Sequence, residues 1–147
     1  MPDNPVTVEV LAAPNSRDTE AIARLISHLS SARPPDLAEL RDLVSSPSVT
    51  MFVARSGDDI VGTASLAIFA VLTGRRAWIE DVVVDPLFQG RGIASQLVAA
   101  ALRLAAESGC WTVDLTSRPS RQEANRLYER LGFVRRETNV YRISLES

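Results

Sequence analysis

Hydrophobic and polar residues recur with distinct periods along this chain, and each change of period marks a new element. Val6 to Leu11 alternates apolar and polar positions, which predicts a strand. A turn at residues 14–16 supplies a plausible helix cap, and a second turn signal stands at residues 34–35. The first helical pattern, which follows residue 16, has its apolar positions at Ala21, Ile22, Leu25, Ile26 and Leu29. A second, shorter helical pattern follows the prolines and ends near Pro47.

The middle of the chain consists of β-rich runs separated by short turns. These runs are Met51 to Arg55, Ile60 to Val71 and Ala77 to Val84. Residues 56–59 and 73–75 carry glycine and polar residues typical of hairpin turns. We therefore expect an antiparallel meander of three strands.

Helix and strand alternate in the second half. Apolar positions about four apart predict a helix from Gly92 to Glu107. Trp111 to Thr116 reads as a strand, and a full helix between it and the preceding strand makes the two strands parallel. A last helix is expected over Arg121 to Leu131. Phe133 to Glu137 and Val140 to Leu145 are expected to form a closing hairpin.

Length and composition favour one layered α/β domain over residues 1–147. A chain of 147 residues with 46% apolar residues can bury a continuous core without disulfides or metal. No repeat, low-complexity tract or long linker interrupts the pattern. The single cysteine, Cys110, has neither a disulfide partner nor the neighbours of a metal site, so we expect no metal.

Charge and hydropathy exclude some classes of partner. The net charge is −2, and its arginines and carboxylates are spread along the whole chain, whereas nucleic-acid readers concentrate basic residues on one face. We expect no nucleic acid. No apolar run approaches the roughly 20 residues that cross a bilayer. Residues 1–5 lack the features of a secretory signal, so we expect no membrane association and a cytoplasmic location.

The chemistry is concentrated where a strand turns into a helix, in Val82-Val83-Val84-Asp85-Pro86-Leu87-Phe88-Gln89-Gly90-Arg91-Gly92-Ile93-Ala94. A helix amino terminus presents unpaired N–H groups and a positive dipole end, and glycines let an anion approach the backbone. The segment is neither a GxGxxG fingerprint nor a P-loop. A phosphate site and a tight connection without ligand are both open on this feature alone.

Two segments together resemble one family. Gln89-Gly90-Arg91-Gly92-Ile93-Ala94 is similar to the Q/R-x-x-G-x-G/A signature of GNAT acetyltransferases. Glu123-Ala124-Asn125-Arg126-Leu127-Tyr128-Glu129-Arg130-Leu131-Gly132-Phe133 resembles the A-x-x-L-Y-x-x-x-G-F element on the family's last helix. Trp78 to Val84 also resembles a stretch of glucosamine 6-phosphate N-acetyltransferases, which is too short to assign a substrate.

The resemblance implies a GNAT fold, with a mixed, mostly antiparallel sheet of about seven strands, a splayed parallel central pair and about four helices. It implies acetyl-CoA as co-substrate. By the family pattern, backbone amides near Gly90 to Ala94 hold the pyrophosphate and the strand Val82 to Val84 pairs with the pantetheine arm. The full set of implied cofactor-binding residues is Val82, Val83, Val84, Gln89, Gly90, Arg91, Gly92, Ile93, Ala94, Asn125 and Tyr128.

Acetyl transfer needs a proton acceptor for the amine and a proton donor for the departing thiolate. Tyr128 is the candidate acid, because the family pattern places it near the cofactor sulfur; an aromatic core anchor is the other interpretation. Glu80 is the candidate base, on the expectation that it shares a strand face with Val82. A solvated strand carboxylate remains the alternative. Asp81 is expected on the opposite face.

We thus expect an N-acetyltransferase acting by direct attack in a ternary complex. A regulatory module that binds acyl-CoA with little turnover is the alternative. The acceptor, an amine of a small molecule or peptide, is not identified, and neither is the acyl chain length. Family members are often dimers, so a homodimer is open. Residues 116–118 either contact cofactor or acceptor, or Ser117 to Ser120 cap the last helix.

Overall fold

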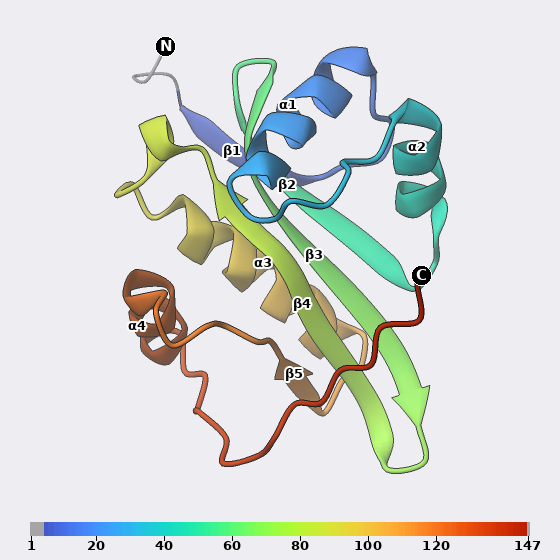
Figure 1. The fold of residues 1–147 in the computed structure, drawn as a ribbon, viewed down its shortest axis with the longest axis vertical. Coiled ribbons are helices and arrows are strands. Elements are labelled where there is room, and N and C mark those ends of the chain that lie inside the picture. The colour runs from blue at the N-terminus through green and yellow to red at the C-terminus, as the bar shows by residue number, and fades with distance from the viewer. Residues whose placement is uncertain (1–4, 147) are drawn as a thin grey trace. The chain divides into compact units, whose positions relative to one another are not determined.

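The computed structural model describes residues 5–146. The chain divides into two compact units, one ending at Thr116 and one beginning at Ser117, and each is described by itself. Figure 1 shows the elements of both.

The first unit is built on a mixed sheet. Its strands are β1 (Val6–Val10), β2 (Val49–Ser56), β3 (Asp59–Val71), β4 (Gly74–Val84) and β5 (Thr112–Asp114), in that spatial order. The first four strands pair antiparallel, and β5 pairs parallel to β4. The expected meander and parallel crossover are both confirmed.

Helices cover both faces of this sheet (Figure 1). The helices α1 (Ser16–Ser27) and α2 (Leu37–Ser45) pack on one face, and α3 (Ile93–Glu107) packs on the other. We call these the α1 face and the α3 face. The core of the α1 face consists of Leu11, Ala21, Ile22, Leu25, Leu40, Met51, Val53, Ile60 and Val83. On the α3 face Leu97, Val98, Ala101 and Ala105 are fully buried.

A buried ion pair ties α1 to the sheet. Asp18 is 2% exposed, and its Oδ1 accepts a 2.9 Å hydrogen bond from Nη1 of Arg55 on β2. Glu9 on β1 approaches the same guanidinium at 3.4 Å. Asp18 also accepts from the N–H of Asn15 in a capping box, so one carboxylate serves both the helix end and the sheet contact.

The parallel strand β5 is shorter than expected and is held at one end. Pairing joins Arg76 to Thr112 and ends at Trp78 with Asp114. Next to this pairing, the N–H of Trp111 donates to the carbonyl of Arg75 at 2.8 Å. The Trp111 ring lies against Gly74, where an added Cβ would come within 3.0 Å of it. A side chain at Gly74 would therefore displace the indole.

The second unit contains α4 (Gln122–Arg130), and the closing hairpin expected after it does not form. Over the described residues 133–146 the backbone is irregular, so the sheet has five strands rather than about seven. Phe133 is half-buried, but the apolar residues after it are at least 71% exposed: Val134, Val140, Tyr141, Ile143 and Leu145. Because a hairpin is marginal in water without an apolar face to pack, β-prone residues alone do not produce one here.

Candidate active site

A bulge interrupts β4 at Asp81. The register pairs Glu80 with Ser65 and Val83 with Thr63, so β4 has one residue more than β3 across this step. Asp81 has φ 55°, in the left-handed region that residues other than glycine seldom occupy. Its carbonyl accepts a 2.8 Å hydrogen bond from Oγ1 of Thr63, which is fully buried. The threonine hydroxyl thus holds the bulge in place.

The bulge corrects the expected side-chain pattern. Simple alternation puts Glu80 on the face of Val82, but the extra residue gives it the face of Val83 instead. Glu80 and Asp81 are both exposed, whereas Val82, Val83 and Val84 are all buried at 9% exposure. Only the backbone of these valines can meet a ligand.

Glu80 is held by its own strand. Nε1 of Trp78 donates a 2.8 Å hydrogen bond to Oε1 of Glu80, which orients the carboxylate along β4. At the neighbouring position, partial burial raises the pKa of the Asp81 carboxyl from its ordinary value. Both carboxylates therefore stand beside the bulge, in different surroundings.

The β4 edge that faces β5 is unpaired beyond Trp78. Pairing with β5 ends there, while β4 continues to Val84, and among the described residues no strand pairs with this edge at 79–84. Strand edges in this state offer N–H and C=O groups to an extended ligand. The parallel pair that the family resemblance implies is present, and because its pairing ends at Trp78 it leaves a fork that opens at Ile79.

A short turn carries β4 into α3. Asp85 Oδ1 accepts from the N–H of Leu87 at 2.9 Å and starts a 3-10 turn, η1 (Pro86–Phe88). The guanidinium of Arg91 lies over the Phe88 ring, with Cζ 5.0 Å from the centroid. Gln89 Nε2 reaches the carbonyl of Val84 at 3.4 Å. The predicted cofactor residues at 89 and 91 therefore shape the turn.

The amino terminus of α3 is open. Gly92 is the N-cap residue, with φ 75°, and no side chain caps this helix end. An added Cβ at Gly90 or Gly92 would meet no protein atom within 4 Å, so both glycines border free space. Ile93 is buried and Ala94 half-buried, so their backbone N–H groups rather than their side chains are available to a ligand. These residues fit a phosphate group.

The second unit brings Asn125 and Tyr128 together on α4. Tyr128 is 6% exposed, and its ring packs edge-on against the Phe133 ring, with 5.8 Å between the ring centroids. Burial raises the pKa of Tyr128 above its ordinary value, and the positive charge of Arg121 partly offsets this rise. Asn125 Nδ2 donates to the carbonyl of Arg118 at 3.0 Å, so this side chain holds the segment before the helix.

The capping role suggested for Ser117 to Ser120 is wrong. The N-cap of α4 is Arg121, and no side chain caps it. Ser117 Oγ is buried without a hydrogen-bond partner among the described residues. Like α3, helix α4 therefore begins without a side-chain cap on its backbone N–H groups.

Sequence reasoning missed Thr63. A threonine inside a strand normally signals β-propensity and nothing more. Only the register, which pairs Thr63 with Val83 next to the bulge, brings its hydroxyl to the Asp81 carbonyl. The positive φ of Asp81 was not predictable either, since the residue type expected at a positive φ is glycine.

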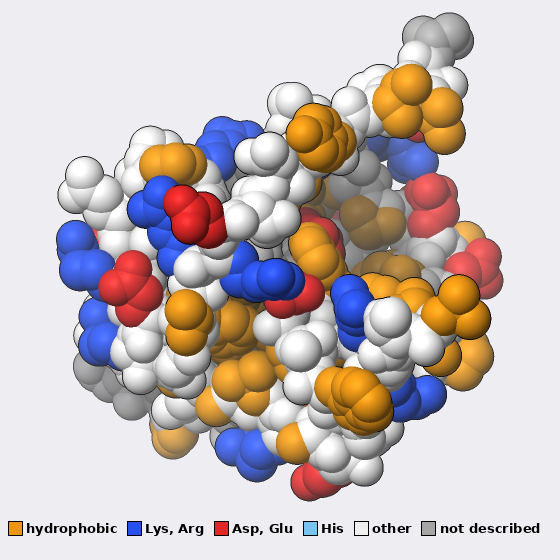
Figure 2. Space-filling model, turned by 90° about the horizontal axis from the view of Figure 1, so that it is seen from below, with side chains coloured by type: hydrophobic (Ala, Val, Ile, Leu, Met, Phe, Trp, Pro, Cys, Tyr) orange, Lys and Arg blue, Asp and Glu red, His pale blue; other side chains and the backbone are white. Residues whose placement is uncertain are grey.

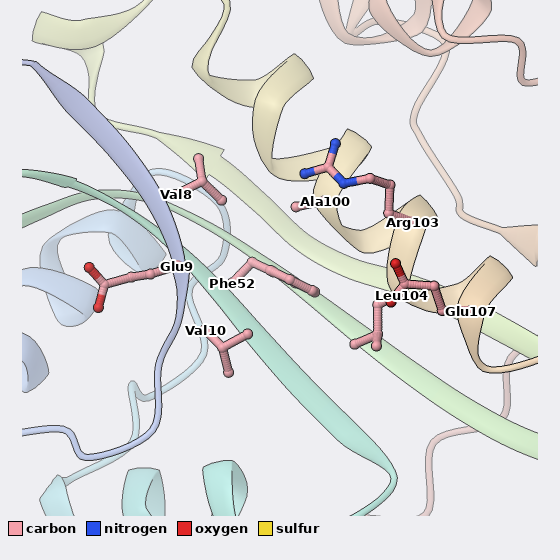
Figure 3. Close-up of a pocket in the computed structure, with 8 residues that line it drawn as sticks. All are labelled: Val8, Glu9, Val10, Phe52, Ala100, Arg103, Leu104 and Glu107. Atoms are coloured by element: carbon pink, nitrogen blue, oxygen red, sulfur yellow. The ribbon is translucent and has the colours of Figure 1, made fainter.

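Other surface features lie away from this site. A hollow of about 310 Å³ on the α3 face lies between β1 and the end of α3 (Figure 3). Figure 2 shows arginines and carboxylates interspersed with hydrophobic side chains on one face, without a basic patch. Within residues 5–146 no group of three or more His, Cys, Asp or Glu could hold a metal. No helix in that range is long and apolar enough to cross a membrane.

The parallel pair with its unpaired β4 edge and the uncapped, glycine-bounded end of α3 agree with the fold that the family resemblance implies. The family model for the Acetyltransferase (GNAT) family matches residues 19–133. The chain belongs to this family, and it is an acetyl-CoA-dependent N-acetyltransferase.

Individual relatives agree with this assignment. A glucosamine 6-phosphate N-acetyltransferase from Trypanosoma brucei brucei is 34% identical over 131 residues, covering 84% of this chain and 87% of the relative. The N-acetyltransferase YjgM of Escherichia coli is 30% identical over 131 residues, covering 80% of this chain and 77% of the relative. A Trypanosoma brucei acetyltransferase crystal structure superposes with a TM-score of 0.80 at 30% identity, covering 96% of this chain and all of that one. An aminoglycoside N-acetyltransferase solved with CoA, 22% identical and covering 95% of both chains, shares the fold at a TM-score of 0.78.

Proposed function

We propose that the protein transfers an acetyl group from acetyl-CoA directly to a primary amine of a small molecule or peptide, with both bound in a ternary complex. One observation carries this proposal. The unpaired edge of β4 runs past a bulge and through a short turn into the open end of α3. An extended arm ending in a phosphate group fits that order of backbone groups.

The cofactor would be held mainly by backbone atoms. The N–H groups from Gly90 to Ala94 would bind the pyrophosphate, with Gln89 and Arg91 supporting the turn. The edge of Val82 to Val84 would pair with the pantetheine arm, in agreement with the burial of these side chains. Asn125, with Nδ2 engaged to Arg118, would contribute its Oδ1 as an acceptor.

Acetyl-CoA supplies an activated acyl group, and the protein's residues supply proton transfer and position. The amine nitrogen bonds to the acetyl carbon as the carbon–sulfur bond breaks. Glu80, oriented by Trp78, takes the amine proton directly or through water. Tyr128 donates a proton to the sulfur, and its raised pKa keeps the phenol protonated before transfer.

Thr63 acts as a positioning residue in this scheme. Its buried hydroxyl fixes the Asp81 carbonyl, and so the direction of the next N–H groups, which would polarise the acetyl carbonyl. We expect Thr63→Val, similar in shape but without the hydroxyl, to lower kcat about tenfold or more while acetyl-CoA affinity holds. Thr63→Ser should restore most of the rate. Equal loss in both variants would make the role one of packing.

The activity is tested by thiol release from acetyl-CoA with purified protein and a panel of amines, amino sugars, polyamines and peptides. Glucosamine 6-phosphate belongs in the panel because the trypanosomal relative is named for it. Release that requires both acceptor and protein supports the proposal. Binding of acetyl-CoA with no release across the panel would instead favour an acyl-CoA-binding regulatory module.

A further inference from the structure

The α1 face of the sheet is partly open beside the bulge. Along β3, Ala64 and Leu66 are fully buried on the α3 face, whereas Ser65 and Ala67, which alternate with them and lie on the α1 face, are half-buried. Because the side chains of Ser65 and Ala67 are short, these two residues form a shallow surface, which we call the floor. The β4 residues paired with them are Glu80 and Trp78, which border this floor with larger side chains.

Two carboxylates flank the Trp78 indole on this face. Glu80 lies two residues further along β4 and accepts the indole N–H. Asp114 on β5 pairs with Trp78 in the parallel register, which puts both side chains on one face. Within residues 5–146 neither carboxylate takes part in an ion pair. We call Trp78 and Asp114 the acceptor face; along β4, Glu80, the proposed base, stands between Trp78 and the bulge.

The arginine of β4 on this face, Arg76, is engaged at the hairpin turn. Arg76 precedes Trp78 by two residues, so it shares the face. Its Nη2 donates a 2.7 Å hydrogen bond to Oγ1 of Thr73, in the turn at the end of the β3–β4 hairpin. Among the β4 and β5 side chains on this face, the charges next to the indole are therefore the carboxylates of Glu80 and Asp114.

We propose that the acceptor face binds a second cationic group of the acceptor, so that the preferred substrate is a diamine or polyamine. This rests on the proposed function, which places the reacting amine at the bulge. An aromatic ring bordered by carboxylates attracts an ammonium group through cation–π contact and charge-assisted hydrogen bonds. A carboxylate or phosphate at the same place would face Asp114 and be repelled.

The spacing sets the size of such an acceptor. A strand rises about 3.3 Å per residue, so Trp78 and the bulge next to Val82 are on the order of 10 Å apart. An acceptor whose amines are separated by several carbon atoms can span this distance. One end would reach the bulge as the other rests on Trp78.

Direct binding tests the acceptor face without any turnover. The chain has two tryptophans, so Trp111→Phe leaves Trp78 as the single indole reporter. Cadaverine, pentylamine and aminovalerate share a five-carbon chain and carry a cation, nothing or an anion at the far end. In fluorescence titrations we expect cadaverine to bind about tenfold more tightly than pentylamine, and aminovalerate to bind most weakly.

Variants in the same background locate the effect. Asp114→Asn should bring cadaverine close to pentylamine, whereas Glu107→Gln, an exposed carboxylate on α3, should leave the difference intact. Equal affinity for the three ligands, or a preference that survives Asp114→Asn, would overturn the proposal.

Kinetics separate this proposal from the general one. If the enzyme acetylates amines but kcat/KM ranks pentylamine level with cadaverine, the acceptor face is wrong and the N-acetyltransferase mechanism stands. If cadaverine binds as expected but no thiol is released with any amine, the mechanism fails and the cation site stands.

Discussion

The helices of this protein begin in two different ways. Helices α1 and α2 are closed by complete capping boxes, Asn15 with Asp18 and Asp36 with Glu39. Helices α3 and α4 begin at Gly92 and Arg121 with no side-chain cap. The closed helices hold the core of the α1 face, and the open ones carry the residues proposed to meet the cofactor. An amino terminus that satisfies its own N–H groups stabilises the fold, whereas one that leaves them unsatisfied can bind an anion.

The largest effect is expected on the open helix α4. Tyr128→Phe keeps the ring and its contact with Phe133 but removes the proton donor, so kcat should fall about a hundredfold or more while acetyl-CoA affinity is unchanged. Tyr141→Phe, at an 87% exposed position, is the matched control. Steady-state rates with acetyl-CoA titration measure both.

The pH profile sharpens this test. The raised pKa means that the Tyr128 phenol keeps its proton through neutral and mildly alkaline pH. Wild-type kcat should therefore show no alkaline loss due to this group below about pH 10. Full turnover in Tyr128→Phe would remove the tyrosine from its proposed role.

In the capped helix α1, Asp18→Ala should lower the free energy of unfolding by about 3 kcal/mol. It breaks a buried pair, leaves Arg55 with the longer contact to Glu9 and removes the Asp18 half of the α1 capping box. Asp42→Ala on α2, an exposed position, should cost less than about 0.5 kcal/mol. Urea unfolding of the two variants measures the difference, and similar midpoints would show that the pair is not needed.

A charge placed at the open end of α3 should act on binding. Asp and Asn both tolerate the positive φ of Gly92 better than other side chains do, so both variants should fold. Gly92→Asp sets a carboxylate where the pyrophosphate is proposed to lie, and should weaken acetyl-CoA binding about tenfold relative to Gly92→Asn. Calorimetric titration measures both. Equal affinities would place the phosphate elsewhere.

The smallest effect concerns the closed end of α2. The hydrogen bonds of Glu39 to Arg33, and then to the backbone N–H of Asp36, lower its pKa to about 2. A lowered acid pKa adds stability above the ordinary value of the carboxyl, which is lost as pH falls towards 2. The Arg33–Glu39 pair is exposed to solvent, so the loss of stability at low pH should be slight. An NMR titration of Glu39 measures the midpoint, and a midpoint near 4.5 would contradict this contact.

The sequence predicted the parts of the fold that rest on periodicity. Helices α1 to α4 and strands β1 to β4 appear where the sequence pattern placed them. In α1, α3, β2 and β3 most apolar positions of the pattern are ones that the core buries. The glycine turn before α3 was readable for a similar reason, since its residue types are tied to a backbone need. Gly90 and Gly92 both have a positive φ, which favours glycine, so the residue types themselves indicate the turn.

The rest depended on contacts that no local pattern contains. The bulge arises from an Asp81 carbonyl meeting a buried hydroxyl on the neighbouring strand, so the face of Glu80 was misassigned. The alternation in residues 140–145 predicted a strand, but its apolar side chains are exposed in the structure. Strand pairing is decided by the partner, and the partner lies outside any window of sequence.

The β4–β5 pair is anchored at one end only. The anchor consists of the Trp111 ring against Gly74 and the backbone hydrogen bond from Trp111 to Arg75. The bulge and the glycine turn lie beyond the other end of the pairing. An extended ligand that adds to the β4 edge at 79–84 therefore competes with no β4–β5 ladder hydrogen bond.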